Sequence, residues 1–329
     1  MRTMENKLNH LIRKSKICGV SAACIDSVTA SSQSFYLGVM GGVPPFSSIP
    51  VAAGMLYDLA SLTKVVGTTT RILQLVDSGV LELTTKCNEI LSEFPLLQMT
   101  IEELLLHRSG LPADFKEKQL FTEEMLSSFL ENFTPKDYDK TIYSDIGYLL
   151  LGLVIERIDG QELEDTFKRN IFEPLGMTQT TYYPNFQRLI LPTEVTNSRG
   201  IILGTVHDSK ANRWPRPAGS AGLFAPLEDM IRFGQGIMLN KKIDGSVLFS
   251  TAIYQRLLET SISNRTLGWE TPFGEGKIYH TGFTGTSIGI DLIKQRGLIL
   301  LTNRIHPTRE NTDFLTHRLE LYRDFFKGE

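Results

Sequence analysis

The sequence has few cysteines, and their spacing suits neither a disulfide framework nor a metal site. Only Cys18, Cys24 and Cys87 occur, and an odd number at wide spacing does not build a set of disulfides. No Cys/His spacing matches a zinc site, and no His-Glu-x-x-His is present. We therefore expect three buried or half-buried thiols, and a reaction without a metal or another cofactor.

Long apolar runs and blocks of one charge are also missing. No stretch reaches the ~18 consecutive apolar residues of a membrane-spanning helix. Residues 1–16 are basic and polar and lack the apolar run of a signal peptide. The net charge is −3 and the 34 basic residues form no long run, so we expect neither nucleic acid nor an anionic membrane as a partner. The chain as given is typical of a cytoplasmic protein, or of an exported one if a leader was trimmed.

The 329 residues have an ordinary globular composition, with 41% hydrophobic and 22% charged residues. Apolar periodicity predicts helices over 7–16, 99–106, 122–133, 148–158, 162–171, 227–239 and 311–327. Alternating or β-branched stretches predict strands over 20–25, 34–40, 201–206, 277–279, 286–293 and 298–302.

These elements predict an α/β fold of the α+β kind, built as a single domain over 1–329. An antiparallel sheet formed by both ends of the chain, 1–60 and 200–329, would be flanked by terminal helices. A mostly helical lobe, 61–199, would be inserted between them. A cleft between the lobes is a usual place for a functional site, and loops such as 116–119 and 188–200 are expected to supply its walls.

Ser61 and Lys64 stand three residues apart at the start of a predicted apolar helix. Residues at this spacing share a helix face, so the hydroxyl and the amine can meet. A serine becomes a good nucleophile when a neighbouring base takes its proton. Desolvation and a helix N-terminus both lower a lysine pKa, which would suit Lys64 to this role, and a free backbone N–H there could bind an oxyanion.

Two further stretches complete a pattern. Tyr143-Ser144-Asp145 follows Ser-x-x-Lys by about 80 residues, and His280-Thr281-Gly282 lies near the C-terminus. In this order, the motifs resemble those of the serine β-lactamase and penicillin-binding protein family. The resemblance is closest to its class C branch, with the related D,D-peptidases and esterases, and it spans essentially the whole chain. Stretches 105–112, 204–208 and 218–224 are similar to loops of that branch.

The resemblance implies a β-lactamase/transpeptidase-like fold and a serine hydrolase that works through an acyl-enzyme. Ser61 would be acylated, while Lys64 and Tyr143 share its proton and pass it to the leaving group. The oxyanion would lie between the backbone N–H groups of Ser61 and Phe283. Amide or ester bonds in D-amino-acid peptides, β-lactams or esters are the implied substrates. Small molecules or peptides, including peptidoglycan fragments, are the implied partners.

Four further residues of the pattern are expected to bind substrate. Thr281 and Gly282 would line the strand along which the acyl group lies. Asp145 stands where the family usually has asparagine, and His280 where its β-lactamases usually have lysine. A carboxylate near Lys64 raises the lysine pKa and shifts the base role to Tyr143, and a neutral histidine binds a carboxylate less well than lysine. We therefore expect weak β-lactam hydrolysis and better turnover of esters or D-amino-acid amides.

Several alternatives remain open from the sequence. Ser287 lies in a Gly-x-Ser-x-Gly, the nucleophile elbow of α/β-hydrolases, although that motif needs a helix after it. Ser61, His280 and Asp145 could form a triad, which would leave Lys64 and Tyr143 idle. The protein could also bind penicillin or peptidoglycan fragments without turning them over, or act as a carboxylesterase with little β-lactamase activity. Three other histidines are interpreted as turn or core residues: His107, His207 and His306.

Overall fold

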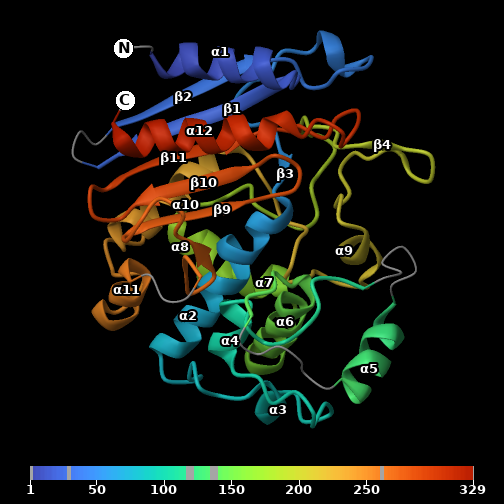
Figure 1. Ribbon diagram of the computed structural model, residues 1–329, viewed down its shortest axis with the longest axis vertical. Coiled ribbons are helices and arrows are strands. Elements are labelled where there is room, and N and C mark those ends of the chain that lie inside the picture. Colours follow the sequence, from blue (N-terminus) through green and yellow to red (C-terminus); the bar gives the residue numbers. More distant parts are fainter. Residues whose placement is uncertain (1–2, 28–30, 116–121, 134–139, 260–262, 329) are drawn as a thin grey trace.

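A computed structural model describes residues 3–27, 31–115, 122–133, 140–259 and 263–328. Its centre is a seven-stranded antiparallel sheet in the order β2–β1–β11–β10–β9–β8–β7 (Figure 1). The two ends of the chain therefore build one sheet, as predicted. Its strands are β1 (Gly19–Asp26), β2 (Ser31–Gly38), β7 (Arg265–Thr266), β8 (Trp269–Glu270), β9 (Lys277–Thr281), β10 (Ser287–Asp291) and β11 (Arg296–Leu301).

Helices cover both faces of this sheet. The terminal helices α1 (Met4–Ser15) and α12 (Asp313–Lys327) lie side by side on one face, while α10 (Leu227–Leu239) packs on the other (Figure 1). Gly289 of β10 lacks a side chain where one would meet the Tyr322 ring of α12 at 2.7 Å, so this helix can lie close to the sheet. The predicted sheet flanked by terminal helices is confirmed.

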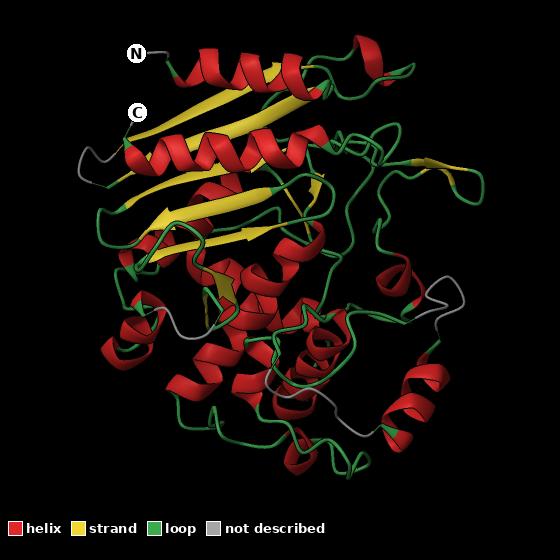
Figure 2. Ribbon diagram, viewed as in Figure 1, coloured by secondary structure: helices red, strands yellow, loops and turns green. Residues whose placement is uncertain are grey.

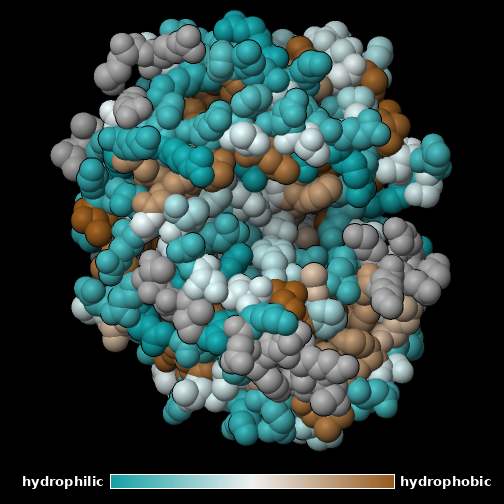
Figure 3. Space-filling view, viewed as in Figure 1, coloured by the Kyte–Doolittle hydropathy of each residue, from teal (hydrophilic) through white to brown (hydrophobic). Residues whose placement is uncertain are grey.

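Most of the remaining helices gather below the sheet, as Figure 2 shows. The division into two lobes at 60 and 200 remains a prediction from the sequence. On the face shown in Figure 3 the surface is hollowed to the right, between the sheet above and the helices below. The other helices are η1 (Phe46–Ser48), α2 (Thr70–Asp77), α3 (Cys87–Ile90), α4 (Ile101–Leu105), α5 (Glu123–Asn132), α6 (Asp145–Asp159), α7 (Leu163–Phe167), η5 (Lys168–Phe172), α8 (Glu173–Leu175), α9 (Ser209–Arg213) and α11 (Thr251–Leu258).

Local sequence signals account for several element boundaries. Thr100 caps α4, because its hydroxyl accepts from Glu103 N at 3.2 Å while Glu103 Oε2 accepts from Thr100 N at 2.8 Å. Gly160 ends α6 in a left-handed conformation. The predicted strand over 201–206 is wrong. Only β5 (Gly200–Ile201) forms there, paired with β4 (Val195–Thr196), because Gly204 turns the chain and the Val206 carbonyl accepts from Arg199.

A third, two-stranded sheet positions the candidate nucleophile. Its strands β3 (Tyr57–Asp58) and β6 (Phe224–Ala225) fix the segment before Ser61 against the segment after Gly222. All three cysteines are free thiols, two half-buried and one buried, as expected. Within the described ranges, no helix combines the length and apolar character needed to cross a membrane.

Candidate active site

The segment that carries Ser61 is held in a strained conformation. Ser61 lies in the short 3-10 helix η2 (Ala60–Leu62), directly after Ala60, whose φ is 47°. A residue with a side chain rarely adopts this conformation unless its surroundings fix it. Here the buried Asp58 carboxylate accepts from Ala60 N at 2.8 Å through Oδ1 and from His207 N at 2.6 Å through Oδ2. The surrounding hydrogen bonds therefore fix the turn that presents Ser61.

The turn after β9 is hydrogen-bonded to the segment that precedes Ser61. The Thr284 hydroxyl donates to Asp58 O at 2.8 Å, and the Thr286 hydroxyl donates to Leu59 O at 3.0 Å. A Cβ on Gly282 would lie 2.4 Å from Leu59 O. The absence of a side chain at Gly282 therefore lets the His280-Thr281-Gly282 segment approach the backbone beside Ser61.

Lys64 is fully buried, and three acceptors surround its ammonium group. It lies at the start of the π-helix η3 (Lys64–Thr69), where the sequence predicted an ordinary helix, and its side chain is 0% exposed. Its Nζ lies 3.1 Å from Ser61 Oγ, 2.8 Å from Ser220 O and 2.7 Å from Asp145 Oδ1. Burial alone would lower the pKa of Lys64, but Asp145 and Tyr143 outweigh it, so the pKa is raised and Lys64 stays an ammonium.

Tyr143 lies against the same ammonium group. Lys64 Nζ is 5.1 Å from the centre of the Tyr143 ring, and the phenol interacts with the side chains of both Ser61 and Lys64. Burial raises the pKa of Tyr143, the Lys64 charge lowers it, and the Asp145 charge raises it, with a raised pKa as the net result. The two side chains next to the Ser61 hydroxyl are therefore an ammonium and a phenol.

His107, which the sequence analysis set aside, holds the backbone on both sides of Tyr143. Its carbonyl accepts from Ile142 N at 2.9 Å, and its Nδ1 accepts from Ser144 N at 3.0 Å. Its ring lies 4.4 Å from the Tyr143 ring, centre to centre. Burial, Arg265 and Lys64 lower the pKa of His107 well below its usual value, so the ring is neutral and accepts through Nδ1.

Asp145 begins α6, with Ser144 as the N-cap, and its carboxylate is shared by two lysines. Oδ1 contacts Lys64, and Oδ2 lies 3.1 Å from Nζ of Lys210, a residue of α9. Burial would raise the pKa of Asp145, but the two ammonium groups outweigh it and hold the pKa well below the usual range. Asp145 is therefore ionised, and Lys210 is a second site residue that the sequence analysis missed.

His280, in β9, is buried near Tyr143 and is neutral. Its ring centre is 6.3 Å from that of Tyr143. Its Nδ1 bonds to Thr281 O at 3.1 Å, and its Nε2 is buried with no hydrogen-bond partner among the described residues. Burial, Lys64 and Arg265 together lower the pKa of His280 well below its usual value. It therefore adds no positive charge to the site, unlike a lysine at this position.

Phe283 follows β9 with its ring at the mouth of the site. Phe283 is 47% exposed, and its ring stacks on that of His207 at 5.5 Å between ring centres. Among the hydrogen bonds of the described residues, none uses the Phe283 N–H. This backbone donor thus remains available, as an oxyanion-binding group requires.

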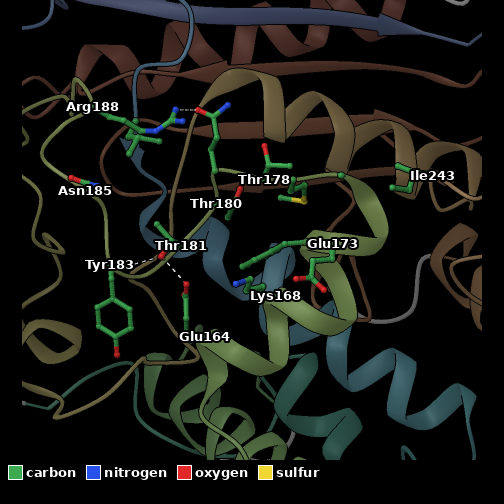
Figure 4. Close-up of a pocket in the computed structure, with 15 residues that line it drawn as sticks. Glu164, Lys168, Glu173, Thr178, Thr180, Thr181, Tyr183, Asn185, Arg188 and Ile243 are labelled. Carbon is green, nitrogen blue, oxygen red and sulfur yellow. Dashed lines mark hydrogen bonds between the residues drawn. The ribbon is translucent and has the colours of Figure 1, made fainter.

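Ser61, Tyr143, Asp145 and Phe283 line one cavity of about 370 Å³. The loop 188–200 supplies Thr196, Ser198 and Arg199 to its wall, while the predicted wall loop 116–119 lies outside the described residues. A larger cavity of about 570 Å³, drawn in Figure 4, has a different lining, which includes Glu164, Lys168 and Arg188. None of the predicted site residues lines that larger cavity.

The structure argues against two alternative nucleophile arrangements. Ser287 starts β10, is 0% exposed, and accepts from the Tyr322 hydroxyl at 3.1 Å, so it is not at an exposed strand-to-helix elbow. A triad needs His280 to bond Asp145, whereas its Nδ1 bonds Thr281 O and Asp145 bonds the two lysines. The described ranges contain no group of three His, Cys, Asp or Glu side chains that could hold a metal ion.

Comparison with known proteins places these residues in a family context. The Beta-lactamase family model matches residues 13–322. The chain is 32% identical over 304 residues to the N-acetylmuramyl-L-alanine amidase of Bacillus subtilis (strain 168), covering 76% of this chain and 68% of that protein. It is 30% identical over 322 residues to the "Putative D-alanyl-D-alanine carboxypeptidase" of Escherichia coli (strain K12), covering 81% and 73%.

A solved structure agrees with the fold. A class C beta lactamase from Rhodobacter sphaeroides superposes with a TM-score of 0.73 at 18% identity, covering 96% of this chain and 99% of that chain. The family match extends over nearly the whole chain, from β1 through α12, and includes every residue of the cavity described above. The chain therefore belongs to the β-lactamase family and is a serine hydrolase.

Proposed function

We propose that the protein hydrolyses amide or ester bonds through an acyl-enzyme on Ser61, with Tyr143 and Lys64 as the proton-transfer pair. The observation that carries this proposal is the Lys64 ammonium, which lies 3.1 Å from Ser61 Oγ and against the Tyr143 ring. Because Lys64 donates to Ser61 Oγ, the serine's own proton can go to Tyr143. The high pKa of Lys64 assigns it the role of a fixed positive charge that favours the phenolate.

Tyr143 is a phenol at rest, so the acylation step starts from the fraction that has lost its proton to solvent. Ser61 Oγ bonds to the substrate carbonyl carbon as its proton passes to that phenolate. The oxyanion lies between the N–H groups of Ser61 and Phe283. Tyr143 then donates the proton to the leaving nitrogen or oxygen as its bond to carbon breaks. In the second step water attacks the acyl-enzyme ester and Tyr143 takes the water proton. Tyr143 then returns this proton to Ser61 Oγ as the bond from Oγ to the acyl carbon breaks and the acid is released.

The substrate class proposed here is D-amino-acid peptides or amides, including peptidoglycan fragments, and simple esters. One relative bears the name of a putative D-alanyl-D-alanine carboxypeptidase, an enzyme for D-amino-acid peptides. Another bears the name of an N-acetylmuramyl-L-alanine amidase, which refers to a different amide bond. The neutral His280 favours esters and D-amino-acid amides, which carry no free carboxylate, because a β-lactam carboxylate would meet no lysine there. We therefore expect β-lactams to be poor substrates.

The first test asks whether Ser61 is the nucleophile. A fluorophosphonate probe followed by peptide mapping should label Ser61, and Ser61→Ala should abolish that label and reduce ester turnover to background. Label on another serine would contradict the assignment. A folded wild-type protein with no label on any serine would favour the non-catalytic binder.

The second test separates the substrates. Wild type and Ser61→Ala are compared on a D-Ala-D-Ala peptide, a short-chain p-nitrophenyl ester and nitrocefin. We expect turnover of the peptide or the ester to exceed that of nitrocefin. Efficient cleavage of nitrocefin with the ester ignored would overturn the proposed substrate class but leave Ser61 as the nucleophile.

A further inference from the structure

A second buried lysine lies beside the proposed catalytic group and has no part in the chemistry above. The Lys210 side chain is 1% exposed, yet it borders the same cavity as Ser61. It comes from α9, whose N-cap is Asp208. An ammonium group is retained at this depth only where anionic partners hold it.

Three carboxylates surround Lys210. Its Nζ lies 3.1 Å from Asp145 Oδ2, 3.1 Å from Asp114 Oδ1 and 3.2 Å from Asp208 Oδ2. The side chains of Asp114 and Asp208 are 26% and 25% exposed, so water also reaches them. Asp145 is different, because its other oxygen lies 2.7 Å from Lys64 Nζ. One carboxylate is thus held between two ammonium groups.

The charge of Asp145 works against the proposed chemistry. A negative charge beside Lys64 favours the ammonium, and beside Tyr143 it favours the neutral phenol. Asp145 acts in this direction on both groups. Whichever of the two takes the Ser61 proton, an uncompensated Asp145 would make its basic form rarer at neutral pH. A positive charge on the far side of Asp145 offsets this effect.

We propose that Lys210 is a positioning residue that neutralises Asp145 and so keeps the basic form of the Lys64–Tyr143 pair populated at neutral pH. This inference rests on the proposed function. Lys210 acts only through Asp145, since its contacts are the three carboxylates and not Ser61.

Apart from Lys64 itself, none of the described groups that face Tyr143 places a positive charge beside the Asp145 carboxylate as Lys210 does. His107 and His280 are neutral, and Tyr148 is a buried phenol. Arg265 is 5.7 Å from the Tyr143 ring centre and is paired with Glu270 at 3.3 Å. The groups facing Tyr143 are Lys64 from η3, Asp145 and Tyr148 from α6, His107 after α4, Arg265 from β7 and His280 from β9.

The experiment measures the rate of Ser61 acylation by a p-nitrophenyl ester as a function of pH. On the rising limb of this profile, the rate increases as the base loses its proton. Lys210→Met keeps the aliphatic chain but removes the charge, so the rising limb should shift to higher pH by about one unit. At a given pH on that limb, acylation should then be roughly tenfold slower than in the wild type. Lys210→Arg keeps the charge and should leave the limb near its wild-type position.

Two controls isolate the role of the charge. Lys294→Met removes the same charge from an exposed turn between β10 and β11, and should not move the limb. In an Asp145→Asn background, Lys210→Met should no longer shift the limb, because no carboxylate at 145 needs compensation. If Lys210→Met does not fold, Lys210→Gln serves in its place.

A limb that stays in place in the folded Lys210→Met protein overturns the inference, even if the maximal rate or melting temperature falls. That result would give Lys210 a purely structural role. An equal shift in the Asp145→Asn background also overturns it, because Lys210 would then act independently of Asp145. Absence of label on wild-type Ser61 would instead overturn the proposed function, and this inference with it.

Discussion

At the scale of single residues, His107 shows how one side chain can fix the orientation of another. Its carbonyl and its Nδ1 accept from the backbone N–H groups on the two sides of Tyr143, and its ring lies tilted against the Tyr143 ring. Its own φ is 57°, a conformation that asparagine tolerates better than most residues. His107 therefore makes contacts around Tyr143 that a residue with only a turn or core role would not make.

This geometry predicts that His107→Ala slows Ser61 acylation by about 10- to 100-fold, because the loss of the Nδ1 acceptor lets Tyr143 shift out of position. His107→Asn should restore most of the rate, since its Oδ1 can accept from Ser144 N and its backbone tolerates the positive φ. The measurement is the burst rate with a p-nitrophenyl ester in each folded variant.

A double-mutant cycle with Tyr143→Phe provides the control. If His107 acts by positioning the phenol, His107→Ala should cost little more once the hydroxyl of Tyr143 is gone. Fully additive losses in the cycle would contradict a positioning role. Equal rates for His107→Ala and wild type would do so as well.

At the scale of secondary structure, α6 and the segment 218–221 touch through their glycines. A Cβ on Gly219 would lie 2.3 Å from Tyr148 O and 3.0 Å from Gly152 Cα, so only glycine fits there. The segment then offers two carbonyls to side chains of the π-helix η3. Gly219 O accepts from the Thr68 hydroxyl at 2.7 Å, and Ser220 O accepts from Lys64 Nζ at 2.8 Å. This close approach therefore helps to fix the position of Lys64.

Gly219→Ala should push this segment away from α6 and loosen both hydrogen bonds. We expect a loss of about 1–3 kcal/mol in the free energy of unfolding, as for other overpacked cores, together with slower acylation. Gly147→Ala on the same helix is the matched control. Its Cβ would meet its nearest neighbour at 3.4 Å, an ordinary contact, and alanine favours a helix. Denaturant unfolding and burst kinetics check both, and equal stability of the two variants would refute the packing argument.

At the scale of the whole molecule, local patterns predicted the large elements better than the connections between them. α10 and the capping box of α4 follow from apolar period and cap residues within a few positions. β7 and β8 have two residues each and offer no periodicity to recognise. Their pairing with the sheet depends on contacts that a local pattern does not contain.

The site divides in the same way. Ser61 and Lys64 lie in a short motif whose chemistry can be inferred locally, whereas the family resemblance implied the roles of Tyr143 and His280. The structure places all four around one ammonium group and one phenol. The role of Lys210 depends on carboxylates from three segments, 114, 145 and 208, which lie far apart in the chain. A lysine in the stretch 207–211 gives no local sign that folding will place it beside Asp145.

The buried histidines also make the stability of the whole fold depend on pH. In the folded protein the pKa values of His107 and His280 lie well below the usual 6.5, mainly because of burial. In the unfolded chain these rings take up protons below pH ~6.5, whereas the folded protein does not. Stability should therefore fall on acidification below pH ~6.5, by about 1.4 kcal/mol per pH unit for each of the two histidines.

Denaturant unfolding between pH ~5 and ~6.5 measures this slope above the range in which most unfolded carboxylates titrate. Asp58 and Asp229 act in the opposite direction, because burial raises their pKa values, but they remain in every variant. His280→Asn should therefore reduce the slope of the unfolding free energy against pH by the contribution of one histidine, about 1.4 kcal/mol per pH unit. His10→Gln, on the exposed side of α1, should leave the slope unchanged. An unaltered slope in His280→Asn would mean that His280 does not resist protonation in the folded protein, which would also remove the reason to expect β-lactams to be poor substrates.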